Sequence, residues 1–313
     1  MAIPLQVPDF GIARRRSRPG ERVVVGLLAL CALLSVLVTV GIVVVLAGEA
    51  IRFFTKVSIV DFLTGTRWAP AGGRVDAGDF GVLPLINGSL MIAAGSLVVG
   101  LPLGLATAVY LSEYARPRVR AVVKPVLEVL AGIPTVVVGF FALNFVTPSL
   151  LRPLFGPERV FIFNAAAGAI AVGLMILPVI ASISEDAMQA VPSALREAAF
   201  GMGASRRVVS LRVVMPAALS GIAASVILGV SRAVGETMVV TIAAGNTPRL
   251  TTNFFESIQT LTAYIAQTVS GEAAAGTTRY QSLFAVGATL FVITLAMNLL
   301  SIRLVRRFRQ AYQ

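Results

Sequence analysis

Two opposite charges, Arg232 and Glu236, lie four residues apart inside the apolar segment 217–245. A charged side chain near the centre of a bilayer costs about 3 kcal/mol, so it normally faces protein or water. Arginine offers a planar fork of N–H donors that fits the oxygens of a phosphate group, and Glu236 can hold that fork while no anion is present. The pair therefore predicts an anion pathway, and the alternative is a buried ion pair that only fixes helix register.

A single helix over this segment would place the charges on a face of small residues. Residues spaced three or four apart share one side of a helix, which here joins Ser225, Gly229, Arg232 and Glu236. An overlapping ridge of small residues runs through Gly221, Ser225, Gly229 and Ala233. Such a ridge lets another helix approach closely, so we expect this face to pack against protein rather than lipid.

The composition indicates an integral membrane protein, because 57% of the 313 residues are hydrophobic and only 13% are charged. The net charge of +11 comes from basic residues beside apolar runs, which favours a role in membrane orientation over nucleic-acid binding. Histidine is absent and Cys31 is the single cysteine, so no disulfide framework or Cys-based metal site is expected. Neither Lys56 nor Lys124 ends a Gly-rich phosphate-binding loop, so any ATPase must be a separate chain.

Six apolar runs predict an all-α membrane protein with six transmembrane helices. They lie at 23–47, 85–111, 125–146, 161–182, 217–245 and 282–304. The first run has 25 residues, longer than the apolar region of about 7 to 15 residues in a signal peptide, and we expect it to be retained. Gly132 and Pro134 predict a break in the third helix, and 254–269 is a candidate amphipathic segment.

The predicted domain organisation follows from these runs. It comprises a basic tail at 1–22, a first helix at 23–47, an extracytoplasmic loop at 48–84, a core of five helices at 85–305 and a basic tail at 306–313. Together with Arg303 at the end of the last span, the tails and the loops 113–124 and 183–216 hold 17 of the 26 Lys and Arg residues. By the positive-inside rule both termini are cytoplasmic, and 183–216 is the longest cytoplasmic loop.

The loop 183–216 contains a pattern typical of two short helices joined by a glycine turn. Helix formers follow Pro192 and Ser193, and Gly201 and Gly203 then permit a sharp exit. An apolar face able to enter a partner's groove is predicted from four residues of the first helix, namely Ala194, Leu195, Ala198 and Ala199.

The same loop resembles the EAA motif of the permease subunits of ABC importers. The matching residues are Glu197, Ala198, Ala199, Gly203 and Pro216, while Val213 and Met215 depart from the usual Ile and Leu but stay apolar. The resemblance implies the type I ABC importer permease fold and a non-catalytic transport subunit in the cytoplasmic (inner) membrane. It also implies that these five residues couple the chain to a separate ATPase dimer. ATP and Mg would be held by that dimer, and no cofactor by this chain.

The segment 231–238, followed by Gly245, Asn246 and Thr247, is similar to the corresponding helix of the phosphate-specific ABC importer, C-type. The segment 80–85 fits the same family, and the likeness extends over about residues 80 to 305. This resemblance implies that Arg232 and Glu236 take part in phosphate passage. The implied partners are an A-type second permease subunit and an extracytoplasmic phosphate-binding protein, together with membrane lipid.

Three other functions are compatible with parts of the pattern. An ABC permease for sulfate, molybdate or an organic solute would share the loop motif. In an ion-coupled secondary transporter, Glu236 would carry protons or Arg232 would bind an organic anion, but such a carrier has no ATPase to dock on 183–216. A membrane sensor or scaffold would retain wild-type uptake when Arg232 is changed.

Overall fold

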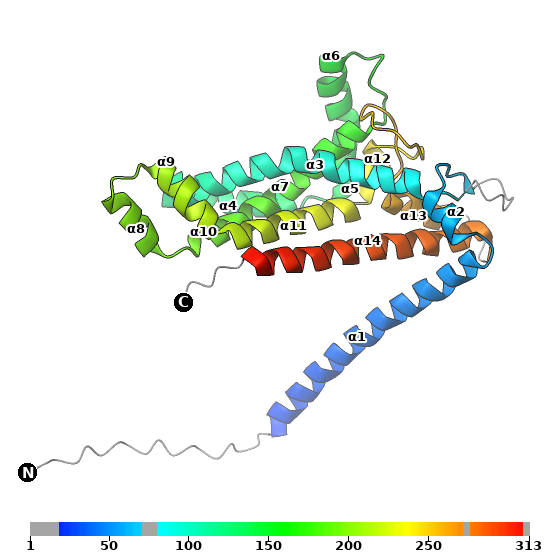
Figure 1. Cartoon of the computed structure of the whole chain (residues 1–313), viewed down its shortest axis with the longest axis horizontal. Helices are drawn as coiled ribbons and strands as arrows, with labels where there is room; N and C mark the ends of the chain where they lie inside the picture. Colours follow the sequence, from blue (N-terminus) through cyan, green and yellow to red (C-terminus); the bar gives the residue numbers. More distant parts are fainter. Residues whose placement is uncertain (1–18, 71–79, 272–275, 309–313) are drawn as a thin grey trace, which may run out of the picture. The chain divides into compact units, whose positions relative to one another are not determined.

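The computed structural model describes residues 19–70, 80–271 and 276–308. The greater part of the predicted basic tails therefore lies outside the described residues. The chain divides into two compact units, Met1–Gly48 and Glu49–Gln313. Helix α1 (Pro19–Phe54) begins in the first unit and ends in the second (Figure 1).

Valine and leucine dominate the part of α1 in the first unit. Their side chains are exposed from Val23 to Leu37, with Leu28 at 64% exposure. At 1.5 Å per residue, a helix of 36 residues is roughly 54 Å long and exceeds a hydrocarbon core of about 30 Å. The described part of this unit thus leaves its apolar surface for lipid or another protein.

The long elements of the larger unit are all helices among the described residues. The one β contact in this part of the chain is an isolated bridge between Trp68 and Phe80. In chain order its helices are α2 (Ile59–Thr64), α3 (Leu83–Val109), α4 (Pro117–Ala131), α5 (Thr135–Phe141), α6 (Arg152–Phe155), α7 (Ala165–Gln189), α8 (Ser193–Gly201), α9 (Arg206–Val209), α10 (Met215–Ala217), α11 (Leu219–Gly235), α12 (Met238–Ala243), α13 (Leu261–Ser270) and α14 (Thr278–Phe308). Short π-helical turns extend three of them, at Tyr110–Tyr114, Ala142–Leu151 and Ser210–Val214.

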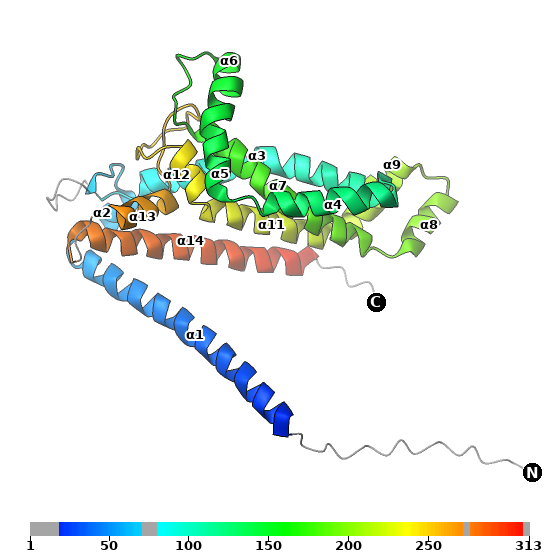
Figure 2. The same cartoon turned by 180° about the vertical axis from the view of Figure 1, so that it is seen from behind.

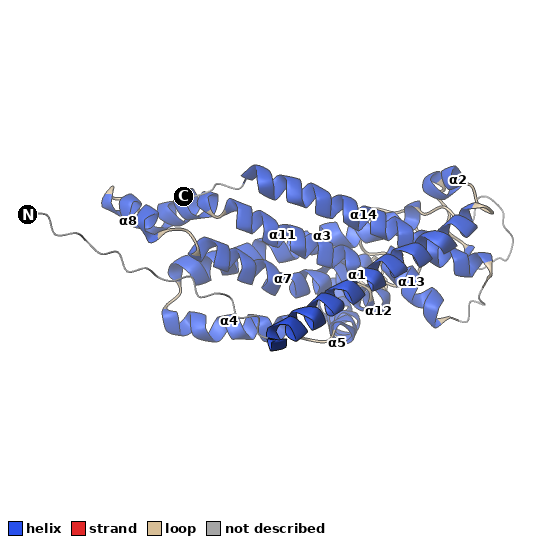
Figure 3. Ribbon diagram, turned by 90° about the horizontal axis from the view of Figure 1, so that it is seen from below, coloured by secondary structure: helices blue, strands red, loops and turns tan. Residues whose placement is uncertain are grey.

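Four of these helices, α3, α7, α11 and α14, run side by side in the larger unit (Figures 1 and 3). Helix α8 lies beyond one end of this group, and α2 and α13 lie at the other end (Figures 1 and 2). The segment that should meet a cytoplasmic partner is therefore separated from α2 and α13 by the length of the group.

Within the described residues, five helical segments are long and apolar enough to cross a membrane. They are Arg22–Phe54, Leu83–Tyr114, Thr135–Phe155, Ala165–Gln189 and Thr278–Arg303. A sixth crossing is possible if the pair Arg206–Ala217 and Leu219–Gly235, bent by 72°, forms one span. The all-α class and the expected number of spans are therefore confirmed.

The predicted third span, 125–146, is wrong in its limits. Helix α4 ends at Ala131, and the apolar span begins only at Thr135 and runs to Phe155. The predicted break is confirmed, because Pro134 adopts an extended conformation with ψ of 131° and cannot continue the preceding helix. The turn expected from residue 147 begins instead at Gly156, whose φ is +92°.

Two other limits also differ. Helix α7 continues to Gln189, so the first residues of the predicted loop 183–216 are helical. The candidate amphipathic segment at 254–269 is helical only from Leu261, where the Thr260 hydroxyl caps α13 by accepting the N–H of Ala263. Neither Pro178 within α7 nor the polar residues 184–186 end that helix.

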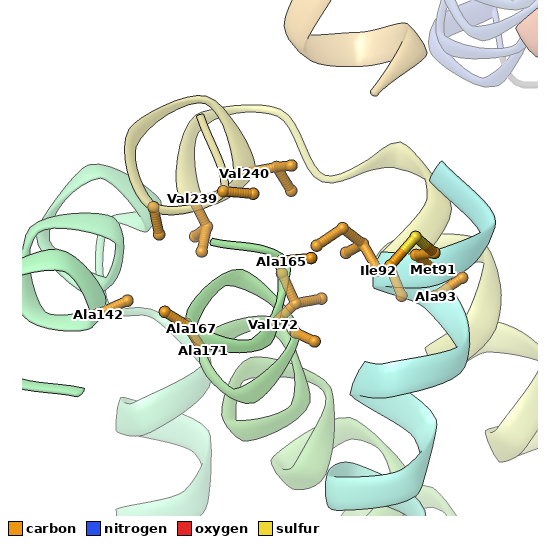
Figure 4. Packing of buried hydrophobic residues seen from close by; sticks show 14 of the residues in the cluster. Met91, Ile92, Ala93, Ala142, Ala165, Ala167, Ala171, Val172, Val239 and Val240 are labelled. Atoms are coloured by element: carbon orange, nitrogen blue, oxygen red, sulfur yellow. The ribbon is translucent and has the colours of Figure 1, made fainter. Parts of the chain in front are cut away.

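Glycine allows α3 and α7 to approach at backbone distance. A Cβ atom at Gly100 would lie 2.6 Å from the Gly173 carbonyl oxygen, and one at Gly173 would lie 2.9 Å from the Ser96 carbonyl oxygen. Small residues of α3 and α7 thus form a helix-packing surface. The main apolar core continues from this contact through Ile92, Val172 and Val239 (Figure 4).

Replacing Gly100 with valine should destabilise the larger unit by about 1–3 kcal/mol, because a well-packed interior has no room for the added methyl groups. Thermal unfolding of the detergent-solubilised protein would measure the loss. Gly41→Val is the matched control, since nothing lies within 4 Å of a Cβ built at Gly41. Equal melting temperatures for the two variants would contradict the close α3–α7 contact.

Candidate transport pathway and coupling site

Helix α8 carries the Glu197, Ala198 and Ala199 part of the EAA motif, and these residues lie on different sides of the helix. Ala199 is 4% exposed and packs with Met188 of α7 and Val209 of α9, whereas Glu197 and Ala198 are exposed. The same apolar cluster contains Ala108 of α3 and Ile222 of α11. The motif therefore packs on the end of the helix group through Ala199 and exposes Glu197 and Ala198 on the other side.

A glycine turn ends α8, as predicted. Gly203 has φ of +81°, a conformation that side chains other than glycine rarely adopt. Around it, the Gly203 N–H donates to the Phe200 carbonyl at 2.9 Å and the Ala204 N–H donates to the Ala199 carbonyl at 3.1 Å. These bonds satisfy the carbonyls at the end of α8 and direct the chain into α9.

The predicted apolar docking face on α8 is wrong in part. Ala194 and Ala198 are exposed, but Ala199 is buried and Leu195 packs on the internal cluster. The exposed large apolar residues are instead Phe200 and Met202, at 45% and 84% exposure. Helical spacing alone did not identify this surface because Met202 follows the end of α8.

Pro216 lies at the start of the short helix α10, just before the bend of 72° that leads into α11. Its ring fixes φ and removes one backbone N–H donor from the helical stretch that continues from the π-helical turn Ser210–Val214. Ala218 then adopts φ of −87° and ψ of 4°, which ends α10. The motif proline therefore marks the joint between the segment that carries α8 and α9 and helix α11.

The fifth span is not one continuous helix over 217–245. Helix α11 ends at Gly235, Glu236 is extended with φ of −66° and ψ of 131°, and α12 begins at Met238. The break is stable because its polar groups have partners: the Glu236 carbonyl accepts the Thr262 hydroxyl at 2.7 Å, and its carboxylate accepts the Val239 N–H at 3.3 Å. Arg232 and Glu236 consequently do not share one helical face.

The small-residue ridge on α11 packs against α7, as expected. A Cβ at Gly221 would lie 2.3 Å from the Ala187 Cβ, and the Ser225 and Ser184 hydroxyls are 2.7 Å apart in a fully buried pair. Arg232, one turn before the break, is exposed. The ion pairs of the described residues include neither Arg232 nor Glu236, so the structure does not bring these two charged groups together.

A buried carboxylate on α7 organises a separate group of charges. The Glu185 side chain is 0% exposed, and its oxygens lie 2.6 Å from Arg120 Nη2 and 2.9 Å from Lys124 Nζ. Gln189 donates a third hydrogen bond to it at 2.7 Å. Three donors therefore compensate the buried charge and attach α4 to the end of α7.

Lys124 also donates to Asp186 at 2.5 Å. This hydrogen bond raises the pKa of Lys124 above its ordinary value of 10.5, against the lowering effect of burial. The stabilisation is complete below pH 10.5 and is lost only as the pH rises through the higher folded-state value, so the bridge is intact at neutral pH.

The sequence analysis used Arg120 and Lys124 only to predict the orientation of the chain in the membrane. The available signal was the four-residue spacing of Glu185 and Gln189 at the polar end of α7.

A helix broken after Gly235, a helix α8 that ends in a glycine turn and a bend between them are features of a membrane transport permease. The chain belongs to the family described as "Binding-protein-dependent transport system inner membrane component", whose model matches residues 100–311. With its apolar spans, it is thus a multi-pass protein of the cytoplasmic membrane.

Individual relatives of the chain have more specific descriptions than the family. The chain is 34% identical to "Probable ABC transporter permease protein YqgH" of Bacillus subtilis, covering 86% of each chain. It is 33% identical to "Phosphate transport system permease protein PstC" of Mesorhizobium japonicum, over 81% of this chain and 82% of that protein. Its fold matches a chain in the crystal structure of a bacterial alginate ABC transporter, with a TM-score of 0.64, 17% identity, and coverage of 92% and 96%.

Replacing Glu185 with glutamine should destabilise the protein by about 1–3 kcal/mol, because the partly exposed Arg120 and Lys124 lose their charged acceptor. Asp186→Asn is the matched control: its side chain is 60% exposed, and a loss of less than about 1 kcal/mol is expected. Thermal unfolding at neutral pH would compare the two. A larger effect for Asp186 would show that the buried carboxylate does not organise the group.

Proposed function

We propose that this chain is a permease subunit of an ATP-driven importer that moves inorganic phosphate across the cytoplasmic membrane. The observation that carries the proposal is the break after α11, which leaves the guanidinium of Arg232 exposed and without an ion-pair partner among the described residues. The relatives named as phosphate transport permeases support the choice of anion.

Arg232 is suited to bind an anion transiently during transport rather than to hold it permanently. It lies 13 residues beyond the start of α11, roughly 20 Å along the helix, so it belongs to the interior of a bilayer about 30 Å thick. An uncompensated cation at that depth must face water or another subunit. Its fork of donors would bind two phosphate oxygens at once, while one site of this kind remains weak enough for release.

Glu236 holds the path open in this proposal rather than pairing with Arg232. Its carboxylate fixes the start of α12 and its carbonyl is tied to Thr262, so the chain stays extended at the break. Extended backbone at membrane depth is tolerated where it lines a cavity or is buried in protein. Transporters use such discontinuous helices to line substrate sites.

The proposed assembly has an A-type second permease, an ATPase dimer and an extracytoplasmic phosphate-binding protein. This chain would be non-catalytic, and the ATPase would hold ATP and Mg. ATPase closure would act on α8 through Glu197, Ala198, Ala199 and Gly203, and Pro216 would pass the movement to α11. Alternating access then follows from the different affinity of the ATPase for the two states.

Changing Arg232 to glutamine should lower phosphate uptake at least tenfold without loss of complex assembly. Arg232→Lys should retain part of the uptake, because it keeps the charge but loses the fork. Uptake of radiolabelled phosphate, normalised to purified complex, measures both. Arg118→Gln, an exposed arginine on α4, controls for loss of charge. Wild-type uptake in a correctly inserted Arg232→Gln protein would refute the pathway role.

Changing Gly203 to alanine should weaken ATPase association several-fold, because its φ of +81° strains any other residue by about 1 kcal/mol. Gly201→Ala is the matched control, since Gly201 is helical and both sites have nothing within 4 Å of an added Cβ. Co-purification of the ATPase with the permease reports the difference. Equal association in the two variants would count against the coupling role of the glycine turn.

A further inference from the structure

Arg196 in α8 contacts three separate segments. Its Nη1 donates to the Val191 carbonyl at 2.6 Å, and its Nη2 donates to the Met188 carbonyl at 2.7 Å and to Glu113 Oε1 at 3.1 Å. Met188 belongs to the last turn of α7, and Glu113 to the π-helical turn that ends α3. One side chain thus links α8, α7 and α3 immediately before Glu197.

These contacts are sheltered from solvent. The Glu113 side chain is 7% exposed and that of Arg196 is 21% exposed. Glu113 also accepts the Ser112 hydroxyl at 3.0 Å, which fixes its carboxylate. Hydrogen bonds between charged groups are about twice as strong as neutral ones, and here they also satisfy carbonyls at the C-terminal end of α7.

A second arginine of the same loop contacts the same π-helical turn. The Arg206 guanidinium carbon lies 5.9 Å from the centre of the Tyr114 ring, within the range of a cation–π contact. Arg196 and Arg206 stand on either side of the Gly203 turn, and their targets, Glu113 and Tyr114, are adjacent. The loop is therefore attached to the end of α3 before and after its glycine turn.

We propose that Arg196 is a positioning residue for energy coupling: it makes α8 move as one body with the ends of α7 and α3. A push on α8 also reaches the membrane helices through the apolar packing of Ala199 and through Pro216 and α11. Through Arg196 the same push acts directly on the close-packed α3–α7 pair. This proposal rests on the proposed function, because it assumes that an ATPase acts on α8.

The test uses the whole transporter complex in proteoliposomes with a phosphate-loaded binding protein. Arg196→Gln and Glu113→Gln should each assemble with the ATPase and hydrolyse ATP, but transport at least tenfold less phosphate per ATP than wild type. Arg118→Gln should keep the wild-type ratio. An unchanged ratio in both variants, or uptake and hydrolysis that fall in parallel, would overturn the proposal.

A crosslink gives an independent readout, including the case in which Arg196→Gln fails to assemble. In a Cys31→Ser background, Glu113→Cys with Arg196→Cys should have low uptake, which a bifunctional thiol reagent should restore by joining α8 to the end of α3. Uptake that stays low after complete crosslinking would overturn the proposal. If the wild-type complex takes up no phosphate, the phosphate assignment is refuted. In that case the Arg196–Glu113 contact is still tested by the effect of the crosslink on ATP hydrolysis stimulated by the binding protein.

Discussion

The close approach of α3, α7 and α11 is the contact on which the other features depend. Between membrane helices there is no hydrophobic driving force relative to lipid, so packing and hydrogen bonds between neighbours must hold them together. Gly100 and Gly173 bring two backbones into contact, and the Ser184–Ser225 hydroxyl pair joins the third helix. Because these surfaces lack flexible side chains, the three helices form a rigid group to which loops and broken segments attach.

Irregular backbone occurs in this protein where local partners satisfy it. The break after α11 is held by Thr262 and by the Glu236 carboxylate, and the Asn164 side chain caps α7 by accepting the Ala167 N–H. In each case a side chain supplies the hydrogen bond that water would supply in a soluble protein. This explains how a membrane helix can end at Gly235, one turn after Arg232.

At the end of the helix group that carries α8, charge pairs connect the elements in addition to the apolar cluster around Ala199. Glu185 joins α4 to α7, and Arg196 joins α8 to α7 and to the turn after α3. Sheltered charge pairs are directional and costly to break singly. They hold α4, α8 and the ends of α3 and α7 in one arrangement, whereas Phe200 and Met202 are exposed.

The sequence by itself determined the all-α class, the number of apolar spans, the glycine turn at Gly203 and the break at Pro134. These depend on local properties: hydropathy, the missing N–H of proline and the conformational freedom of glycine. Only the tertiary structure decided that Glu236 leaves the helix, that Ala199 faces inward, and that Arg120, Lys124 and Glu185 meet. Those outcomes depend on partners distant in the chain, such as Thr262 for the Glu236 carbonyl and α7 for Lys124, which helical periodicity does not encode.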